Sequence, residues 1–342
     1  MRLAPLLAST CLLALFAGSA AAAPAYTEVH ATRLGAPDRW DYVLFDPSSD
    51  RVFVAHGNHT DVVDGHTGRV EGHVGPLDGA HGTVVAPVLG RGFADGGKSR
   101  SLTGFSLTTL KPIGQAQAGE DADAVAYDPG SRHVFVINGD SGTISVIDAA
   151  TLKPLATIDL GAGGLEFAAS DGHGSLFVNL AEAGGIARID IATNTVTARW
   201  KLAGCVSPHG LAYDDLTRRL FTSCENGALK VINAEDGHVV ASLPIGKGSD
   251  SVAVDPKRRL VFSANGTGTL SIIAIHDADH FTAETPLQTP KGARTMAVDP
   301  ATGRIFLASA TADGTTPPPI RGGHARMHFV PGSLKLLMFD PS

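Results

Sequence analysis

The sequence has little positive charge, and this shortage limits its partners. Its 342 residues include 27 lysines and arginines against 34 aspartates and glutamates. Without a basic stripe there is no electrostatic reason to expect binding to DNA, RNA or an anionic membrane surface. The chain also lacks a nucleophile elbow, a Walker loop, an HExxH zinc motif and a CxxCH haem-attachment motif. It therefore contains no complete catalytic motif of those kinds.

Long apolar runs are missing after residue 22. Before that point, Arg2, an apolar stretch at residues 6–16 and alanines at residues 20–22 form the three regions of a secretory signal peptide. Because this stretch is too short to span a bilayer, we expect residues 1–22 to be removed on export. The expected product is a periplasmic or secreted protein without membrane insertion.

Cysteine is scarce, and two of the three cysteines lie outside the expected signal peptide. Cys205 and Cys224 are both placed in the fifth copy of the repeat described below. In an oxidising compartment this pair favours a disulfide. Two alternatives remain: thiolates beside His209 that bind Cu⁺ or Zn²⁺, or two buried free thiols.

A unit of about forty residues returns seven times. In its plainest copy, residues 123–129, 134–139, 143–148 and 154–161 are short, β-branched segments bounded by turn residues. This pattern predicts a four-stranded meander. One anchor position closes the first segment of each copy, 40 to 44 residues after the previous one. The anchors are Asp46, Ala86, Asp128, Asp171, Asp214, Asp255 and Asp299.

That spacing matches one propeller blade. The sequence therefore predicts an all-β, seven-bladed β-propeller of four-stranded antiparallel blades, with residues 23–342 as a single domain. The segment at residues 26–35 resembles an outer strand without a blade, whereas the last copy ends after its third strand at residue 340. We expect the N-terminal strand to complete the last blade, because this pairing removes two open sheet edges.

The second strands of the repeats carry a family resemblance. Residues 51–56, 133–138, 219–224 and 259–265, together with recurring Asp-Pro turns, resemble the bacterial YVTN-repeat seven-bladed propellers. The resemblance implies the fold and export from the cytoplasm. Its repeat residues are structural, so it implies no catalytic residue.

The clearest functional signal comes from the position five residues before each anchor. In the meander geometry this residue is the first to face the mouth of the central channel. All seven residues are ionisable, although the position is defined by the repeat and not by residue type. We expect them to bind a ligand, the alternative being a solvated rim. They are Asp41, His81, Asp123, Glu166, His209, Asp250 and Arg294.

Two histidines, four carboxylates and one arginine make a net negative mouth that suits a divalent metal ion or a polar small molecule. Neutral imidazole with carboxylate suits Zn²⁺, Cu²⁺, Mn²⁺ or Fe²⁺, whereas carboxylate with asparagine suits Ca²⁺ or Mg²⁺. Only two or three adjacent residues can reach one ion. Of the seven, His81, His209 and Glu166 are the metal candidates.

Two further segments carry possible ligands. The first repeat contains four histidines at positions 56, 59, 66 and 73. We expect the first two in a loop on the channel face and the third on the opposite face, so that they form a surface scatter and not one cluster. A peripheral metal-capture loop is the alternative. In the last repeat, an insertion at residues 310–332 without strand signals either covers the mouth, presenting His324, Arg326 or His328, or packs as a structural loop.

These observations favour an exported, monomeric binding protein that holds a metal ion, a polar small molecule or an envelope protein at the channel mouth. The alternative is a metal-dependent lactonase, hydrolase or lyase. In that case the ion would polarise a carbonyl group, and His81 or His209 would act as general base.

Overall fold

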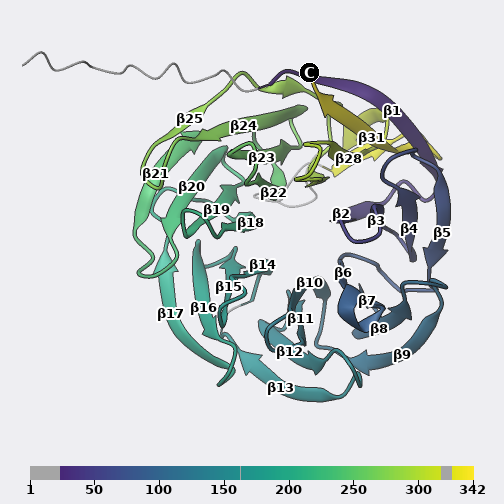
Figure 1. The fold of residues 1–342 in the computed structure, drawn as a ribbon, viewed down its shortest axis with the longest axis vertical. Coiled ribbons are helices and arrows are strands. Elements are labelled where there is room, and N and C mark those ends of the chain that lie inside the picture. Colours follow the sequence, from purple (N-terminus) through teal and green to yellow (C-terminus); the bar gives the residue numbers. More distant parts are fainter. Residues whose placement is uncertain (1–23, 162, 317–325) are drawn as a thin grey trace, which may run out of the picture.

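The computed structural model describes residues 24–161, 163–316 and 326–342, so the expected signal peptide lies outside the described residues. Seven antiparallel sheets of four strand positions each stand around a common centre (Figure 1). The first strand of each sheet lies nearest the centre, and the fourth forms the circumference. The predicted seven-bladed propeller is confirmed.

The strands follow chain order within all blades but the last. Blade one contains β2 (Trp40–Asp46), β3 (Arg51–His56), β4 (His59–Asp64) and β5 (Val70–Val74). Blade two contains β6 (Thr83–Ala86), β7 (Arg91–Gly96), β8 (Ser101–Ser106) and β9 (Pro112–Gln117). Blade three contains β10 (Ala122–Asp128), β11 (His133–Asn138), β12 (Thr143–Asp148) and β13 (Pro154–Asp159). Blade four contains β14 (Leu165–Ser170), β15 (Ser175–Leu180), β16 (Gly185–Asp190) and β17 (Thr195–Lys201).

The last three blades include one with a divided outer strand, blade six. Blade five has four undivided strands, β18 (Pro208–Asp214), β19 (Arg219–Cys224), β20 (Ala228–Asn233) and β21 (Val239–Pro244). Blade six contains β22 (Ser249–Asp255), β23 (Leu260–Asn265), β24 (Thr269–Ile275), β25 (Phe281–Ala283) and β26 (Leu287–Gln288). Blade seven contains β27 (Thr295–Val298), β28 (Ile305–Ser309), β31 (Leu334–Pro341) and β1 (Tyr26–Gly35).

The repeat residues hold each blade together in the same way. The anchor carboxylate accepts hydrogen bonds from the turn that follows it, as Asp128 Oδ2 does from the Ser131 N–H at 2.7 Å. In blade two, Ala86 has no such carboxylate, and a short 3₁₀ helix, η1 (Pro87–Leu89), makes the turn instead. One phenylalanine in the second strand of every blade is almost completely buried, which packs the blades against one another. These residues are Phe53, Phe93, Phe135, Phe177, Phe221, Phe262 and Phe306.

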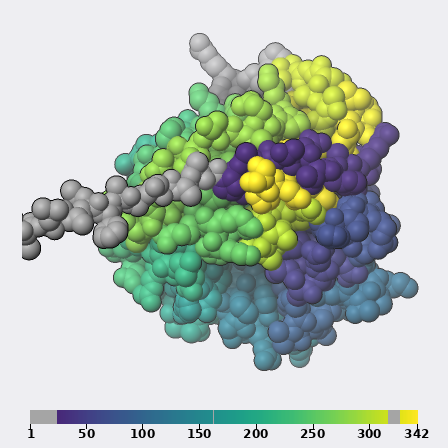
Figure 2. All heavy atoms as spheres, turned by 45° about the horizontal axis from the view of Figure 1, so that its top comes forward, coloured from purple at the N-terminus to yellow at the C-terminus, as the bar shows by residue number. Residues whose placement is uncertain are grey.

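The ring closes through the two ends of the chain. β1 pairs antiparallel with β31, from Tyr26 opposite Pro341 to Gly35 opposite Leu334. Figure 2 shows the purple N-terminal strand beside the yellow C-terminal strand. The Tyr26 ring also packs edge-on against Phe262 of blade six, with the ring centroids 5.6 Å apart. The expected completion of the last blade by the N-terminal strand is therefore present.

The insertion in the last blade differs from the expectation. Instead of a loop without secondary structure, it begins and ends in an antiparallel hairpin of β29 (Ala312–Thr316) and β30 (Arg326–Phe329). The sequence signal was weak because these strands contain few β-branched residues. Within the described residues no helix is long and apolar enough to cross a membrane.

Candidate functional site

The seven residues predicted to face the channel mouth form two groups of ion pairs. In the first, the Nδ1 atom of His81 lies 2.8 Å from Asp41 Oδ2 and 3.0 Å from Asp123 Oδ1. One ligand atom from each of these residues lies within 4.8 Å of the other two, a spacing that a single metal ion can bridge. Asp41, His81 and Asp123 are called the rim triad below.

The second group lies in blades four to seven. His209 Nδ1 is 3.3 Å from Glu166 Oε2 and 3.6 Å from Asp250 Oδ1. The other oxygen of Asp250 forms an ion pair with Arg294, whose Nε lies 2.7 Å away. The three metal candidates from the sequence are thus divided, since His81 belongs to the rim triad and His209 lies with Glu166.

Both histidines of the mouth have a raised pKa. Burial by itself lowers the pKa of His81, but hydrogen bonds to Asp123 and Asp41 outweigh it and raise this pKa to about 11. Burial and Glu166 compete in the same way at His209, whose pKa rises to about 9. Both rings are therefore cations at neutral pH and hold the carboxylates together by charge. With Arg294, they leave the seven residues with one excess negative charge when all four carboxylates are ionised.

Burial acts in the opposite direction on two carboxylates of the rim. Loss of solvent raises the pKa of Glu166 to about 7, although the hydrogen bond with His209 opposes the shift. Burial raises the pKa of Asp41 to about 6 against the hydrogen bond with His81. These carboxyl groups therefore change protonation close to neutral pH, and the net charge of the mouth depends on pH.

Two aromatic rings meet across the centre of the propeller, next to the rim. Tyr42 of blade one and Phe167 of blade four pack edge-on, with the ring centroids 4.8 Å apart. Burial, followed by the charges of Glu166 and Asp123, raises the pKa of the Tyr42 phenol well above its usual range, which places this phenol among the rim carboxylates. An aromatic pair thus connects opposite sides of the ring at the level of the rim.

A cavity of about 1220 Å³ opens at the mouth on the side of blades five, six, seven and one. Three of the seven predicted residues line it, namely His209, Asp250 and Arg294. The other four do not. The sequence analysis missed Arg39 and Trp40, which line the cavity and immediately precede rim residue Asp41 in the chain.

The hairpin of the last blade forms one wall of this cavity. Met327 and Phe329 of β30 line it, and the Phe329 ring packs against Trp40 with the centroids 4.9 Å apart. Gly292 lies beneath the hairpin with φ +87°, and a Cβ atom there would meet Met327 Sδ at 2.9 Å. Of the three residues expected to reach a ligand, His324 lies outside the described residues. The side chain of Arg326 is likewise outside the described part of the chain, and His328 is not among the described residues that line the cavity.

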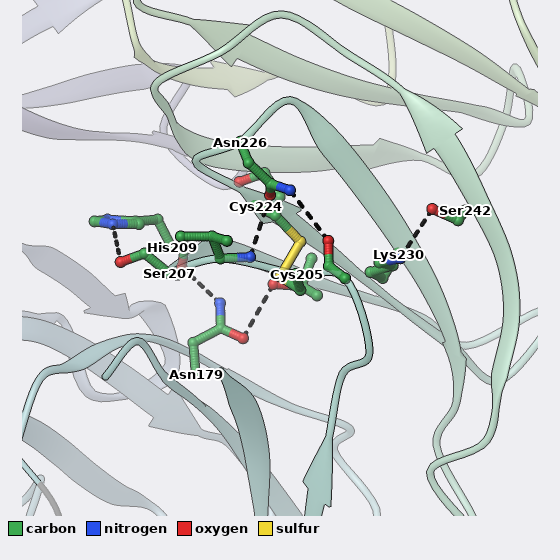
Figure 3. The surroundings of a disulfide bond; sticks show 12 residues. Asn179, Cys205, Ser207, His209, Cys224, Asn226, Lys230 and Ser242 are labelled. Atoms are coloured by element: carbon green, nitrogen blue, oxygen red, sulfur yellow. Dashed lines mark hydrogen bonds between the residues drawn. A yellow bond between two sulfur atoms is a disulfide. The ribbon is translucent and has the colours of Figure 1, made fainter. Parts of the chain in front are cut away.

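A disulfide supports the cavity wall in blade five (Figure 3). Cys205 and Cys224 are bonded, with their Cα atoms 5.3 Å apart, and both are buried. The bond joins the segment before β18 to the end of β19. Asn226 reinforces the junction, because its side chain accepts from the Val206 N–H and donates to the Gly204 carbonyl.

The histidines of blade one do not form the expected surface scatter. His56 is the last residue of β3 and is completely buried, and His59 is the first residue of β4. Their ring centroids are 4.6 Å apart, and the His73 ring lies 5.5 Å from that of His59. Three of the four histidines thus cluster, because the strands extend further toward the mouth than the sequence indicated and β5 brings His73 alongside β4. His66 is exposed in the turn after β4.

Comparison with known proteins supports the fold alone. No protein-family model matches the chain, and no curated protein matches it. Among solved structures, the chain is similar to Kuenenia stuttgartiensis hydrazine synthase, with a TM-score of 0.68 and 15% sequence identity. The alignment covers 88% of this chain and 98% of that one. At this level of identity the likeness indicates a shared propeller architecture and no shared activity.

Proposed function

We propose that the protein is an exported binding protein that takes a small organic anion with an apolar body into the mouth cavity. The observation that carries this proposal is the cavity itself, which is lined by both cationic and apolar side chains. Its volume, about 1220 Å³, is sufficient for a small molecule.

The charges around the cavity favour an anion over a cation. Three carboxylates line the cavity, and each interacts with the protein. Asp250 is already paired with Arg294. The charge of Glu225 acts on His209, whose pKa it helps to raise. Asp38 accepts hydrogen bonds from three backbone N–H groups of residues 332–334. By contrast, Arg39 and Lys247 both line the cavity and are exposed, and neither has an ion pair within the part of the chain that the structure describes. A carboxylate in the cavity would supply the missing partner.

The apolar wall selects the rest of the ligand. Trp40, Phe329 and Met327 present two aromatic rings and a thioether to the cavity. An aromatic or aliphatic body stacked on this wall would gain affinity from burial, while the anionic group would fix its orientation.

Three features support the assignment to the periplasm or the extracellular space. Residues 1–22 have the pattern of a signal peptide, the repeat resembles exported YVTN propellers, and Cys205 is bonded to Cys224. Stable disulfides belong to oxidising compartments. The single propeller domain of residues 23–342 is then the mature protein.

A second candidate function is metal binding at the rim triad. The distances from His81 Nδ1 to its two carboxylates are close to those between ligands of one ion, and Zn²⁺, Cu²⁺ or Ca²⁺ would replace the proton that now joins them. A lactonase, hydrolase or lyase would also need the ion to face its substrate. None of the three triad residues lines the cavity, so binding is proposed in place of catalysis.

The experiment is calorimetric titration of the untagged mature protein with a series of aromatic and aliphatic carboxylates, each beside its uncharged primary amide. We expect one carboxylate class to bind with about 1:1 stoichiometry and its amide to bind at least tenfold more weakly. Lys247→Met and Arg39→Gln should each reduce carboxylate affinity by about 1.5–3 kcal/mol, the range for a charge-assisted hydrogen bond.

The matched control is Lys153→Met, which removes an exposed lysine from the turn between β12 and β13 without touching the cavity. It should bind like the wild type. Equal affinity for a carboxylate and its amide, or full affinity in Lys247→Met, would refute the anion proposal. Capture of an envelope protein that small carboxylates do not displace would instead assign the mouth to a protein partner.

A further inference from the structure

We infer that blade one contains a separate binding site for one divalent transition-metal ion, formed by His56, His59 and Asp61. The two oxygens of Asp61 each face one imidazole. His56 Nδ1 lies 2.7 Å from Oδ2, and His59 Nε2 lies 3.2 Å from Oδ1. The three ligand atoms lie within 4.8 Å of one another. Ligands at about 2.0 Å from a tetrahedral ion stand about 3.3 Å apart, so small side-chain movements suffice to admit it.

Groups outside the site fix which nitrogen of each histidine faces the carboxylate. The other nitrogen of His56, Nε2, lies 2.5 Å from the Pro37 carbonyl oxygen. The other nitrogen of His59, Nδ1, lies 3.0 Å from Asn58 Oδ1. A carbonyl oxygen only accepts, so both of these nitrogens carry hydrogen. When a metal ion takes the place of the proton between each ring and Asp61, both rings direct a lone pair at the ion, as metal-bound histidines do when an outer oxygen holds the opposite N–H.

In two other blades, the residues that correspond to this site have a purely structural role. In the strand register, His56 corresponds to Asn138 in blade three and Asn265 in blade six, the last residues of their second strands. The Asn138 amide donates to Thr143 at 3.0 Å and to Ser145 at 3.1 Å. Asn265 does the same with Thr269 and Ser271.

Blade one changes all three positions of this neutral network at once. The pair that faces Asn138, Thr143 and Ser145, corresponds by register to His59 and Asp61. Each uncharged residue is replaced by a type that binds transition metals. Burying a carboxylate with two imidazoles is costly even though they pair with one another, and the blade has no structural need for them because asparagine, threonine and serine make the same junction elsewhere. A bound cation accounts for the triple replacement.

The site also has an entry path and room for a fourth ligand. The His56 side chain is fully buried, whereas that of His59 is 22% exposed, so an ion enters past His59. His73 stands opposite Asp61 in the β4–β5 register and next to the His59 ring. Two imidazoles and a carboxylate, with His73 or water as fourth ligand, suit Zn²⁺, Cu²⁺ or Ni²⁺ better than Ca²⁺ or Mg²⁺.

The test is Zn²⁺ titration of the mature, untagged protein after stripping with a chelator, followed by elemental analysis after gel filtration. The main variant is His56→Asn/His59→Thr/Asp61→Ser, which installs the blade-three residues and should keep the fold. We expect this variant to bind about one equivalent of Zn²⁺ fewer than the wild type. Its Zn²⁺ affinity at the site should fall by more than about 100-fold, which exceeds the loss caused by removing a group that only supports a ligand. When Asp41→Asn/Asp123→Asn disables the rim triad, bound Cu²⁺ should show nitrogen hyperfine coupling that is lost on adding the triple substitution.

Two controls separate this site from other places. His66→Ala removes the exposed histidine of the same blade and should leave Zn²⁺ binding unchanged. Asp41→Asn/Asp123→Asn disables the rim triad and should retain the ion in blade one. Wild-type protein that takes up no Zn²⁺, or wild-type affinity in the triple variant, overturns the inference. If the triple variant does not fold, His59→Thr alone provides the test, because His59 is partly exposed and its replacement should leave the fold intact. Wild-type Zn²⁺ affinity in His59→Thr would also overturn the inference.

Discussion

The ring of Tyr42 lies edge-on against the ring of Phe167, 4.8 Å between centroids, although the two residues belong to the first and fourth blades. Such a contact between blades that are not neighbours can form only across the axis of the propeller. The contact therefore ties together blades that share no strand pairing and no direct interface.

Tyr42→Ala should be among the most destabilising single substitutions at the mouth. The Tyr42 side chain is 7% exposed and packs with residues of blades three and four, so its loss leaves a void on the axis. We expect the free energy of unfolding to fall by about 3–5 kcal/mol in guanidinium titrations. Tyr42→Phe keeps the ring and should cost less than about 1.5 kcal/mol. Equal stability of the alanine and phenylalanine variants would contradict a stabilising role for the Tyr42 ring.

Removal of the disulfide should destabilise the protein without abolishing the fold. The bond between Cys205 and Cys224 closes a loop with a sequence separation of 19, for which constraint of the unfolded chain contributes about 3 kcal/mol. We expect Cys205→Ser/Cys224→Ser to lower the free energy of unfolding by about 2–4 kcal/mol. A reducing agent should lower wild-type stability to the same level and leave the double variant unchanged. Denaturation curves with and without the reductant provide the comparison.

A chain that starts at residue 36 should lose stability throughout the ring. It lacks β1, which pairs with β31 along its whole length, and it lacks the Tyr26 ring that packs on blade six. Because one blade is then incomplete, β31 becomes an exposed edge and closure fails. Hydrogen exchange should accelerate in blades one and six as well as in blade seven. A chain that starts at residue 24 is the control, and exchange confined to blade seven would contradict cooperative closure.

The fold was predictable from the sequence because its determinants are local and repeated. The turn residues and the β-branched strands recur in all seven copies and the anchor aspartate in six, so one blade explains the others. The closure by residues 26–35 followed from counting strands in the first and last copies. The hairpin β29–β30 was not predicted because it occurs only once, so no second copy in the sequence shows its strand pattern.

The candidate site was predictable only in part, because contacts across the ring do not follow from a repeat of one blade. The spacing located His81 and His209 at the mouth, but it did not show that each would be held as a cation between carboxylates. The contact between the two aromatic rings on the axis was indicated by the residues that directly follow the seven rim positions. Two are aromatic and five are small, and the large side chains fill the space that the small ones leave. In chain order they are Tyr42, Gly82, Ala124, Phe167, Gly210, Ser251 and Thr295.

The pH dependence of stability should report on a carboxyl group behind the rim. Asp95 is completely buried and accepts hydrogen bonds from the backbone N–H groups of His81 and Gly82. Burial raises its pKa to about 8, although the charge of His81 and these hydrogen bonds oppose the shift. The unfolded chain releases this proton near pH 3.8, so the folded protein binds one more proton between that pH and about 8.

The stability contributed by Asp95 is therefore fully present below about pH 4 and is lost as the pH rises toward 8. The slope for one proton is at most about 1.4 kcal/mol per pH unit. Urea titrations between pH 4.5 and 8 should show the free energy of unfolding falling with pH in the wild type and less steeply in Asp95→Asn, whose amide oxygen still accepts from both N–H groups. Glu235→Gln, at a carboxylate that is 68% exposed, should retain the wild-type slope. An unchanged slope in Asp95→Asn would mean that Asp95 is ionised in the folded protein, in which case His81 stabilises it as a buried ion pair.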